Sequence, residues 1–182
     1  MHSVVLTGGA SFCNAVRRTL ISEVSMWAPY EVEMRSNTSC ETDEYLAHRI
    51  GLIPFRKVGN GDEARLCKKG PCIVRASDVE SVDFEVIHPE IEVITLAAGH
   101  ELDIRIFFNK KNGKEHARYS PCAAVGMKCV DGQGRHKISF ETNDKRGSKE
   151  TVLEALDILE SHIDTVLLSL AKQPDPPPRS MC

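Results

Sequence analysis

The sequence predicts an α+β fold in which helices and strands from both ends of the chain combine, with a mainly-β module between them. Three patterns in the 182 residues support this prediction. Apolar residues recur every four positions in an early helix, short strand candidates fill the middle of the chain, and the clearest amphipathic helix comes last. We find no internal repeats.

Two helices and two strands are expected in the first third of the chain. The first helix, at residues 11–24, carries Phe12, Val16 and Leu20 on one face, because apolar residues recur every four positions. Pro29 cannot continue a helix, so the helix ends before it. The other expected elements are a strand at residues 4–6, a half-buried strand at residues 31–35 and a short helix at residues 45–53.

From residue 55 onward the pattern changes to short strands. Turn signals at Gly70-Pro71 and His88-Pro89 separate several of them. This region therefore predicts a small all-strand module inserted into the chain. Its strand candidates are residues 65–68, 72–76, 84–87, 92–96, 101–108 and 123–130.

The end of the chain predicts a strand at residues 136–142 and a long helix, for which Ser148 is the expected N-cap. Apolar residues in this helix step by four and three, the spacing of a seam against another helix. The seam consists of Val152, Leu156, Leu159, Ile163, Val166 and Leu170. A helix packed entirely on its own domain and a helix that also meets a partner both fit this pattern. After Lys172 the Pro-rich tail, residues 173–182, cannot be helical.

The composition shows no strong charge bias. The hydrophobic fraction is 41%, the charged fraction 27% and the formal net charge −3, with acids and bases interspersed. A protein whose main task is to grip a phosphate backbone usually has a basic face. Lys110, Lys111 and Lys114 form a basic cluster, which fits a solvated turn better than a phosphate contact.

The expected location is intracellular. Seven cysteines, an odd number without framework spacing, and a start without a secretory signal pattern favour a reducing compartment with free thiols. No window approaches the roughly 18 consecutive apolar residues of a membrane span, so no membrane association is expected. Nucleus, cytoplasm and, for a virus-encoded protein, virion all stay open.

Candidate catalytic residues are few. The turn at residues 7–9 lacks the lysine of a phosphate loop and the three glycines of a dinucleotide fingerprint. Cys67 and Cys72 have no second pair to complete a zinc site. The acidic residues 41–44 suit the start of a helix better than a catalytic metal site. A stand-alone metal or thiol enzyme is the alternative from another class, and it would use Cys40, His48, His116 and Cys122.

Several stretches resemble a known family. Residues 14–24 are similar to the first helix of the alpha/D family of multisubunit DNA-directed RNA polymerases, and residues 37–54 resemble the motif of its archaeal D-type members and their eukaryotic counterparts. Residues 69–78, 113–121 and 141–159 resemble later segments of the same family, in the same order. The family also contains bacterial alpha and the third-largest eukaryotic subunit.

The resemblance implies two domains and a non-catalytic role. Residues 1–54 with 133–172 would form a dimerisation domain, and residues 55–132 an inserted β-rich domain. The dimerisation domain would pair with a small subunit resembling archaeal L, and the pair would serve as an assembly platform for the large catalytic subunits. The resemblance further implies additional small polymerase subunits as partners. No cofactor and no sequence-specific DNA contact are expected, because the chain departs from the family pattern in the two respects given below. The nucleotidyl-transfer chemistry would belong to the large subunits of the complex.

The resemblance also assigns residues to two interfaces. The dimerisation residues are expected to be Phe12, Val16, Leu20, Val152, Leu156, Leu159, Ile163, Val166 and Leu170. The residues facing the second-largest subunit are expected to be Arg17, Arg18, Asn37, Thr38, Ser39, His48 and Arg49.

Two departures from the family pattern matter. Relatives often carry a cysteine-rich insertion that holds zinc or an iron–sulfur cluster, whereas this middle region has only Cys67 and Cys72, so no cluster is predicted. No bacterial-style DNA-binding domain is expected after Lys172.

An alpha-like homodimer remains the alternative to a heterodimer, because the seam alone does not distinguish them.

Overall fold

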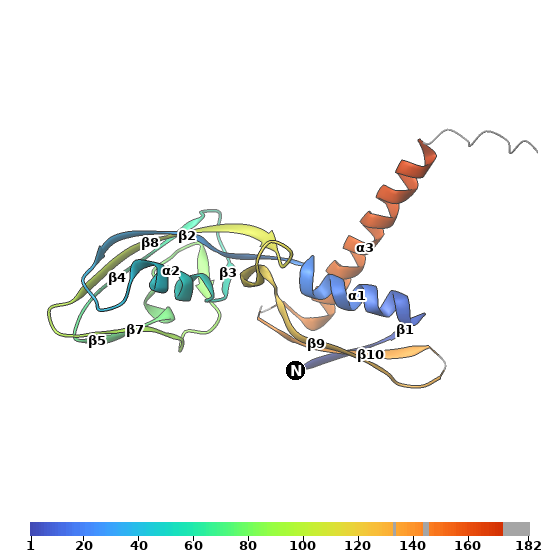
Figure 1. Ribbon diagram of the computed structural model, residues 1–182, viewed down its shortest axis with the longest axis horizontal. Helices are drawn as coiled ribbons and strands as arrows, with labels where there is room; N and C mark the ends of the chain where they lie inside the picture. Colours follow the sequence, from blue (N-terminus) through green and yellow to red (C-terminus); the bar gives the residue numbers. More distant parts are fainter. Residues whose placement is uncertain (133, 144–145, 173–182) are drawn as a thin grey trace, which may run out of the picture.

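The computed structural model describes residues 1–132, 134–143 and 146–172. The chain forms two lobes side by side along its long axis, and the last helix rises away from one of them (Figure 1). The helices are α1 (Ala10–Ser22), α2 (Asp43–Gly51) and α3 (Ser148–Ala171), with short 3-10 helices η1 (Ala76–Asp78) and η2 (Ala117–Tyr119). The strands are β1 (His2–Thr7), β2 (Ser25–Asn37), β3 (Phe55–Lys57), β4 (Glu63–Lys69), β5 (Cys72–Arg75), β6 (Phe84–Val86), β7 (Glu92–Leu96), β8 (Glu101–Asn112), β9 (Cys122–Cys129) and β10 (Arg135–Thr142).

The smaller lobe combines segments from both ends of the chain. Its antiparallel sheet has the order β1-β10-β9, with Val4 opposite Ile138. α1 and α3 pack against each other and against this sheet. Residues 1–24 and 135–171 therefore share one sheet and one core. Its buried residues are Val16, Leu20, Val24, Cys122, Ile138, Phe140, Val152 and Ala155.

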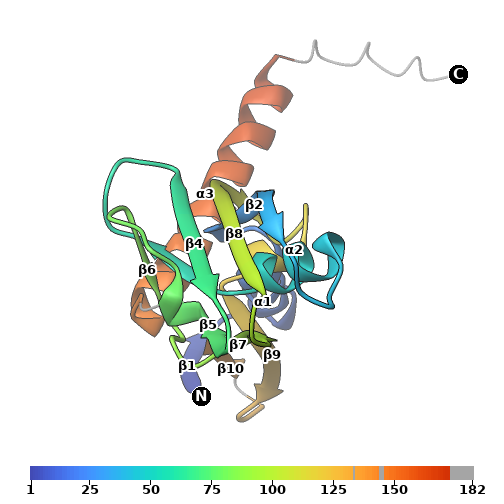
Figure 2. The same cartoon turned by 90° about the vertical axis from the view of Figure 1, so that its left-hand side faces the viewer.

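The larger lobe is built on the antiparallel sheet β2-β8-β4, whose three strands lie side by side in Figure 2. Successive side chains of a strand point to opposite faces. Along β8, Leu102, Ile104 and Ile106 are fully buried, whereas Asp103 and Arg105 lie on the other face. Two-stranded sheets, β3–β6 and β5–β7, and helix α2 complete this lobe. Within the described ranges no helix is long and apolar enough to cross a membrane.

The mixture of helices and small antiparallel sheets fits the predicted α+β class. β2 is much longer than the strand expected at residues 31–35, because it begins at Ser25 and accommodates Pro29. The register with β8 shifts between Pro29 and Glu31. A bulge tolerates a residue that cannot donate a ladder hydrogen bond.

Two local predictions are wrong. Gly147, not Ser148, occupies the N-cap of α3, and no side chain caps the helix there. The reason is that Ser148 already lies in the first turn. Lys110 and Lys111 belong to the end of β8, where they pair with β2, rather than to a turn. The predicted tail at residues 173–182 lies outside the described residues.

Each of the two cores includes a segment next to the expected domain boundaries at residues 54/55 and 132/133. α2 contributes Leu46 and Ile50 to the larger core. Cys122, from β9, lies in the smaller core because β9 pairs with β10. Strand pairing with β10 places β9 in the smaller core, and packing on β2 and β7 places α2 in the larger one. Local composition does not reveal either contact.

Candidate subunit interfaces

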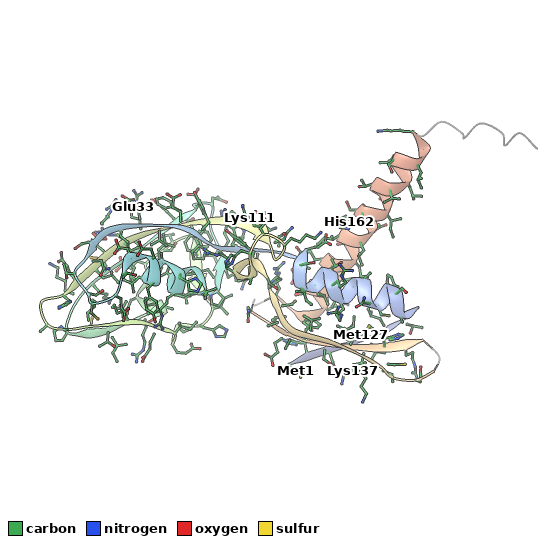
Figure 3. All side chains as sticks on the ribbon, in the orientation of Figure 1. Met1, Glu33, Lys111, Met127, Lys137 and His162 are labelled. Atoms are coloured by element: carbon green, nitrogen blue, oxygen red, sulfur yellow. The ribbon has the colours of Figure 1, made fainter. Side chains whose placement is uncertain are left out.

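The second half of α3 carries an exposed apolar surface. The first half packs on the smaller lobe, where Ala155 has no exposed surface. Beyond His162 the helix stands clear of the rest of the described chain (Figure 3). The large apolar side chains of this part, which we call the α3 patch, are each 56–63% exposed: Ile163, Val166, Leu167, Leu168 and Leu170.

The base of the α3 patch is fixed to α1. Glu23, just after α1, has one carboxylate oxygen 3.2 Å from Nε2 of His162 and the other 2.9 Å from Nζ of Lys114. α1 also has exposed apolar side chains of its own, Phe12 at 47% and Ile21 at 38%. Two helices of the smaller lobe therefore present apolar surface.

The residues predicted for dimerisation differ in exposure. Val16 and Leu20 have no exposed surface, and Val152 is 6% exposed. Leu156 and Leu159 are half-buried against the smaller core. Only Phe12 and the three seam residues within the α3 patch are open to a partner in the single chain. A fully buried side chain cannot touch a partner without rearrangement, so the buried residues hold the two helices in place.

Arg17 and Arg18 lie on α1 in the smaller lobe. Nε of Arg17 donates a hydrogen bond to Oδ1 of Asn14 at 3.0 Å, and the side chain is half-buried. Arg18 is exposed, and its side chain makes no ion pair or hydrogen bond with any residue that the structure describes. An exposed guanidinium of this kind can pair with a carboxylate or a backbone carbonyl of another chain.

Asn37 organises the turn between β2 and α2. Its Nδ2 donates to the carbonyl of Glu41 at 3.0 Å and to Oδ1 of Asp43 at 2.8 Å. Its Oδ1 accepts the backbone N–H of Ser39 at 3.0 Å. Thr38 pairs with the first residue of β8 through its N–H, at 3.1 Å. These three residues therefore fold the loop, and the loop itself lies on the larger lobe, away from Arg17 and Arg18.

Helix α2 joins this loop to β7. Thr42 caps the helix by accepting the N–H of Tyr45 on its hydroxyl at 3.3 Å. Nη2 of Arg49 donates to the carbonyl of Glu92 at 2.6 Å, and Nη1 donates to the Tyr45 hydroxyl at 3.3 Å. His48 is exposed on the same helix.

The segment at residues 113–121 closes the C-terminal end of α1. The last carbonyls of a helix have no partner within it. Here the N–H of Lys114 donates to the carbonyl of Ser22 at 3.0 Å. The hydroxyl of Ser120 donates to the carbonyl of Ile21 at 2.9 Å. A Cβ on Gly113 would lie 2.4 Å from the Ile21 carbonyl oxygen, so only glycine fits this approach.

Arg118 connects the same segment to the larger lobe. Its Nη1 donates to the carbonyl of Pro29 at 2.8 Å, and its Nε donates to Nδ1 of His116 at 3.3 Å. The guanidinium rests on Gly51, at the end of α2, where an added Cβ would lie 2.8 Å from Nη1. Reasoning from the residues alone missed Arg118; the resemblance of residues 113–121 to the family was the signal available for it.

The residues of the enzyme alternative are not assembled into a site. Cys122 is buried in the smaller core, and Nδ1 of His116 accepts the N–H of Arg118 at 3.1 Å. Cys40 and His48 are both exposed, with no hydrogen bond between them in the described chain. Groups of three or more His, Cys, Asp or Glu that could hold a metal ion are absent from the described ranges.

Known proteins resemble the chain over most of its length. The DNA-directed RNA polymerase subunit Rpo3 of Methanocaldococcus jannaschii is 36% identical over 164 residues, which are 88% of this chain and 85% of that protein. The DNA-directed RNA polymerase II subunit rpb3 of Dictyostelium discoideum is 32% identical over 149 residues, 63% of this chain and 49% of that protein. Subunit 3 of the DNA-directed RNA polymerases II, IV and V of Arabidopsis thaliana is 33% identical over 157 residues, again 63% and 49%.

None of the models of known protein families matches the chain. The chain spans about half the length of the Dictyostelium and Arabidopsis relatives and most of the length of the Methanocaldococcus relative. These relatives come from archaea and eukaryotes, and they confirm the resemblance to the alpha/D family. The chain therefore belongs to the alpha/D family, as a relative of subunit 3 (Rpo3/Rpb3) of DNA-directed RNA polymerases.

Proposed function

We propose that the chain is a non-catalytic assembly subunit of a multisubunit DNA-directed RNA polymerase, and that it pairs with a small L-like subunit through α1 and α3. The α3 patch is the observation that carries this proposal. Five large apolar side chains on a helix that extends beyond its own lobe form a surface that a partner is expected to cover. A partner helix packed along the seam would cover them.

The size of the patch supports a stable pair. Full burial of one large apolar side chain stabilises by about 1.5–3 kcal/mol. The five side chains of the α3 patch are already partly covered, so their burial supplies on the order of 5 kcal/mol before the costs of association are subtracted. Phe12 and Ile21 on α1 extend the apolar surface.

The proposed dimerisation domain is the smaller lobe, and the proposed inserted domain is the larger lobe. Two separate cores support this division. It assigns residues 25–54 to the inserted domain and the strand β9 to the dimerisation domain, in place of boundaries at residues 54/55 and 132/133.

We further propose that Arg17 and Arg18, together with the loop and helix at residues 37–54, form the contact surface for the second-largest polymerase subunit. The exposed His48 and the exposed Arg18, whose side chain has no polar partner among the described residues, support this assignment. Asn37, Thr38 and Ser39 contribute by fixing the loop, and Arg49 by fixing α2 against β7. Additional small subunits would complete the complex, without sequence-specific DNA contact by this chain and with a nuclear or cytoplasmic location.

Co-expression with the small L-like subunit of the same genome, followed by size-exclusion chromatography with light scattering, tests the proposal. We expect a one-to-one complex, and aggregation of the chain expressed alone. A soluble two-fold assembly of this chain alone would favour the alpha-like homodimer instead. A stable monomer indifferent to the small subunit would overturn the assembly role.

A further inference from the structure

A basic groove lies where the two lobes meet. It has a volume of about 210 Å³, and its walls come from the start of β2, from β3, from the end of β8 and from the residue before the loop into α3. The walls include Trp27, Arg56, Lys57, Lys110 and Arg146. None of the described residues that line this groove carries a carboxylate. The proposed functions of the lobes do not account for this concentration of positive charge.

Two of the four cations already have acidic neighbours. Arg146 binds the carboxylate of Glu154 on α3 and donates to the carbonyl of Ser25 at 2.9 Å. Arg56 lies directly opposite Glu85 in the β3–β6 pair. Lys57 and Lys110 are therefore the cations on which a ligand would depend.

Lys57 and Lys110 both flank Trp27. Nζ of Lys57 lies 3.8 Å from the centre of the indole ring, and Lys110 lies directly opposite Trp27 in the β2–β8 pair. Lys110 forms no ion pair with any residue in the described part of the chain. Both lysines line the groove, so their like charges repel each other, and an anion bound between them would relieve that repulsion.

The geometry favours a carboxylate over a nucleic acid. Lys57 covers the face of Trp27, so a base cannot stack there unless the lysine leaves. The groove holds one or two side chains rather than a length of phosphate backbone, and the chain carries a net charge of −3. Nucleic-acid interfaces normally need a larger basic surface.

We propose that this groove binds the carboxylate side chains of an acidic segment of a partner polypeptide, held between Lys57 and Lys110 at Trp27. The ligand would contact both lobes, because Trp27, Lys57 and Lys110 belong to the larger lobe and Arg146 precedes α3. Binding would therefore fix the angle between the lobes. This inference does not rest on the pairing proposed for α3.

Trp27 is the only tryptophan in the chain, so its fluorescence reports on this groove alone. The full chain is titrated with a hexaglutamate peptide, and in parallel with an uncharged peptide of the same length, a single-stranded DNA oligonucleotide and inorganic phosphate. We expect a saturable change with hexaglutamate, which weakens when the salt is raised from about 0.05 M to about 0.2 M because screening shortens the range of the attraction.

Variants that each remove one positive charge test whether hexaglutamate binds in this groove. Lys110→Gln and Lys57→Gln should each raise the half-saturating concentration of hexaglutamate about three- to tenfold, because each removes one charge-assisted contact. Lys137→Gln, an equal charge change on exposed β10, should leave it unchanged. The half-saturating concentration is compared rather than the signal size, because Lys57→Gln alters the indole surroundings directly.

Three outcomes would overturn the proposal. The first is no change in Trp27 emission up to millimolar hexaglutamate. The second is tighter binding of the oligonucleotide, which would make the groove a nucleic-acid contact. The third is an equal response to inorganic phosphate, which would mean that any anion suffices. In each case the co-expression result with the small subunit would be unaffected, so the two proposals fail separately.

Discussion

Replacing Gly51 by alanine should change the stability of the chain in opposite directions, depending on whether Arg118 is present. Gly51 is the last residue of α2, and its backbone does not require glycine for a positive φ. The added Cβ would lie 2.8 Å from Nη1 and 3.2 Å from Cζ of Arg118. The guanidinium must therefore move, and its 2.8 Å hydrogen bond to the carbonyl of Pro29 is lost.

The magnitude follows from two opposing effects. Loss of a partly buried hydrogen bond from a charged donor costs about 1.5–3 kcal/mol. Alanine in place of glycine favours a helix by up to about 1 kcal/mol. Gly51→Ala should thus lower the free energy of unfolding by about 0.5–2 kcal/mol in the natural chain. With Arg118→Ala already present, it should raise that free energy by up to about 1 kcal/mol.

Urea unfolding of the four chains of this double-mutant cycle, followed by circular dichroism, measures the coupling. Gly126→Ala serves as the control, because no atom beyond its own chain neighbours lies within 4 Å of the added Cβ and no loss of stability is expected. The reasoning is refuted if Gly51→Ala stabilises the natural chain as much as the Arg118→Ala chain. The guanidinium would then not be held between α2 and β2.

Two further predictions concern the cores and the charged face of the larger sheet. Phe140→Ala should lower the free energy of unfolding by about 3–5 kcal/mol, since Phe140 has no exposed surface, whereas Phe12→Ala should cost less than about 1 kcal/mol because Phe12 is 47% exposed. Urea titrations that show equal losses would contradict the burial of Phe140. The side-chain hydrogen bond from Arg65 holds the pKa of the Asp103 carboxyl below its usual range. The ionised carboxylate therefore stabilises the fold above about pH 4 and loses this effect as the pH falls through the lowered pKa. Asp103→Asn should flatten this part of the pH dependence of stability, and an unchanged profile would show that the pair contributes nothing.

Local periodicity predicted the elements whose burial follows from their own sequence. The strand expected at residues 92–96 is β7, and the helix expected at residues 11–24 is α1, two residues shorter at its end. The short apolar run of β7 lies between turn signals, and the four-residue spacing works for α1 because one stripe of the helix meets the sheet. These patterns are set by the geometry of a single element, so the sequence displays them directly.

Features that depend on distant partners were not visible in the same way. The sequence predicted a strand only at residues 31–35, but pairing with β8 extends β2 back to Ser25 and accommodates Pro29 at a bulge. The hydroxyl of Ser120 reaches the carbonyl of Ile21, 99 positions earlier in the chain. No local pattern encodes such a contact.

The candidate interface shows the same limit. Spacing identified Val152 and Ile163 as equivalent seam positions, yet Val152 is 6% exposed and Ile163 is 60% exposed. The difference arises because the first half of α3 packs on its own lobe and the helix stands clear of that lobe beyond His162, which the heptad pattern does not encode. Sequence therefore predicts which side chains are apolar, and the tertiary fold decides which of them a partner can reach.

The central claim, that α3 beyond His162 binds the small subunit, is tested most directly by a matched pair of variants in the co-expression experiment. Leu167→Glu places a charge within the α3 patch, and Ser161→Glu places the same charge on the exposed helix outside the patch. Light scattering should show the one-to-one complex with Ser161→Glu and its loss with Leu167→Glu. Equal complex formation by both variants would contradict the claim.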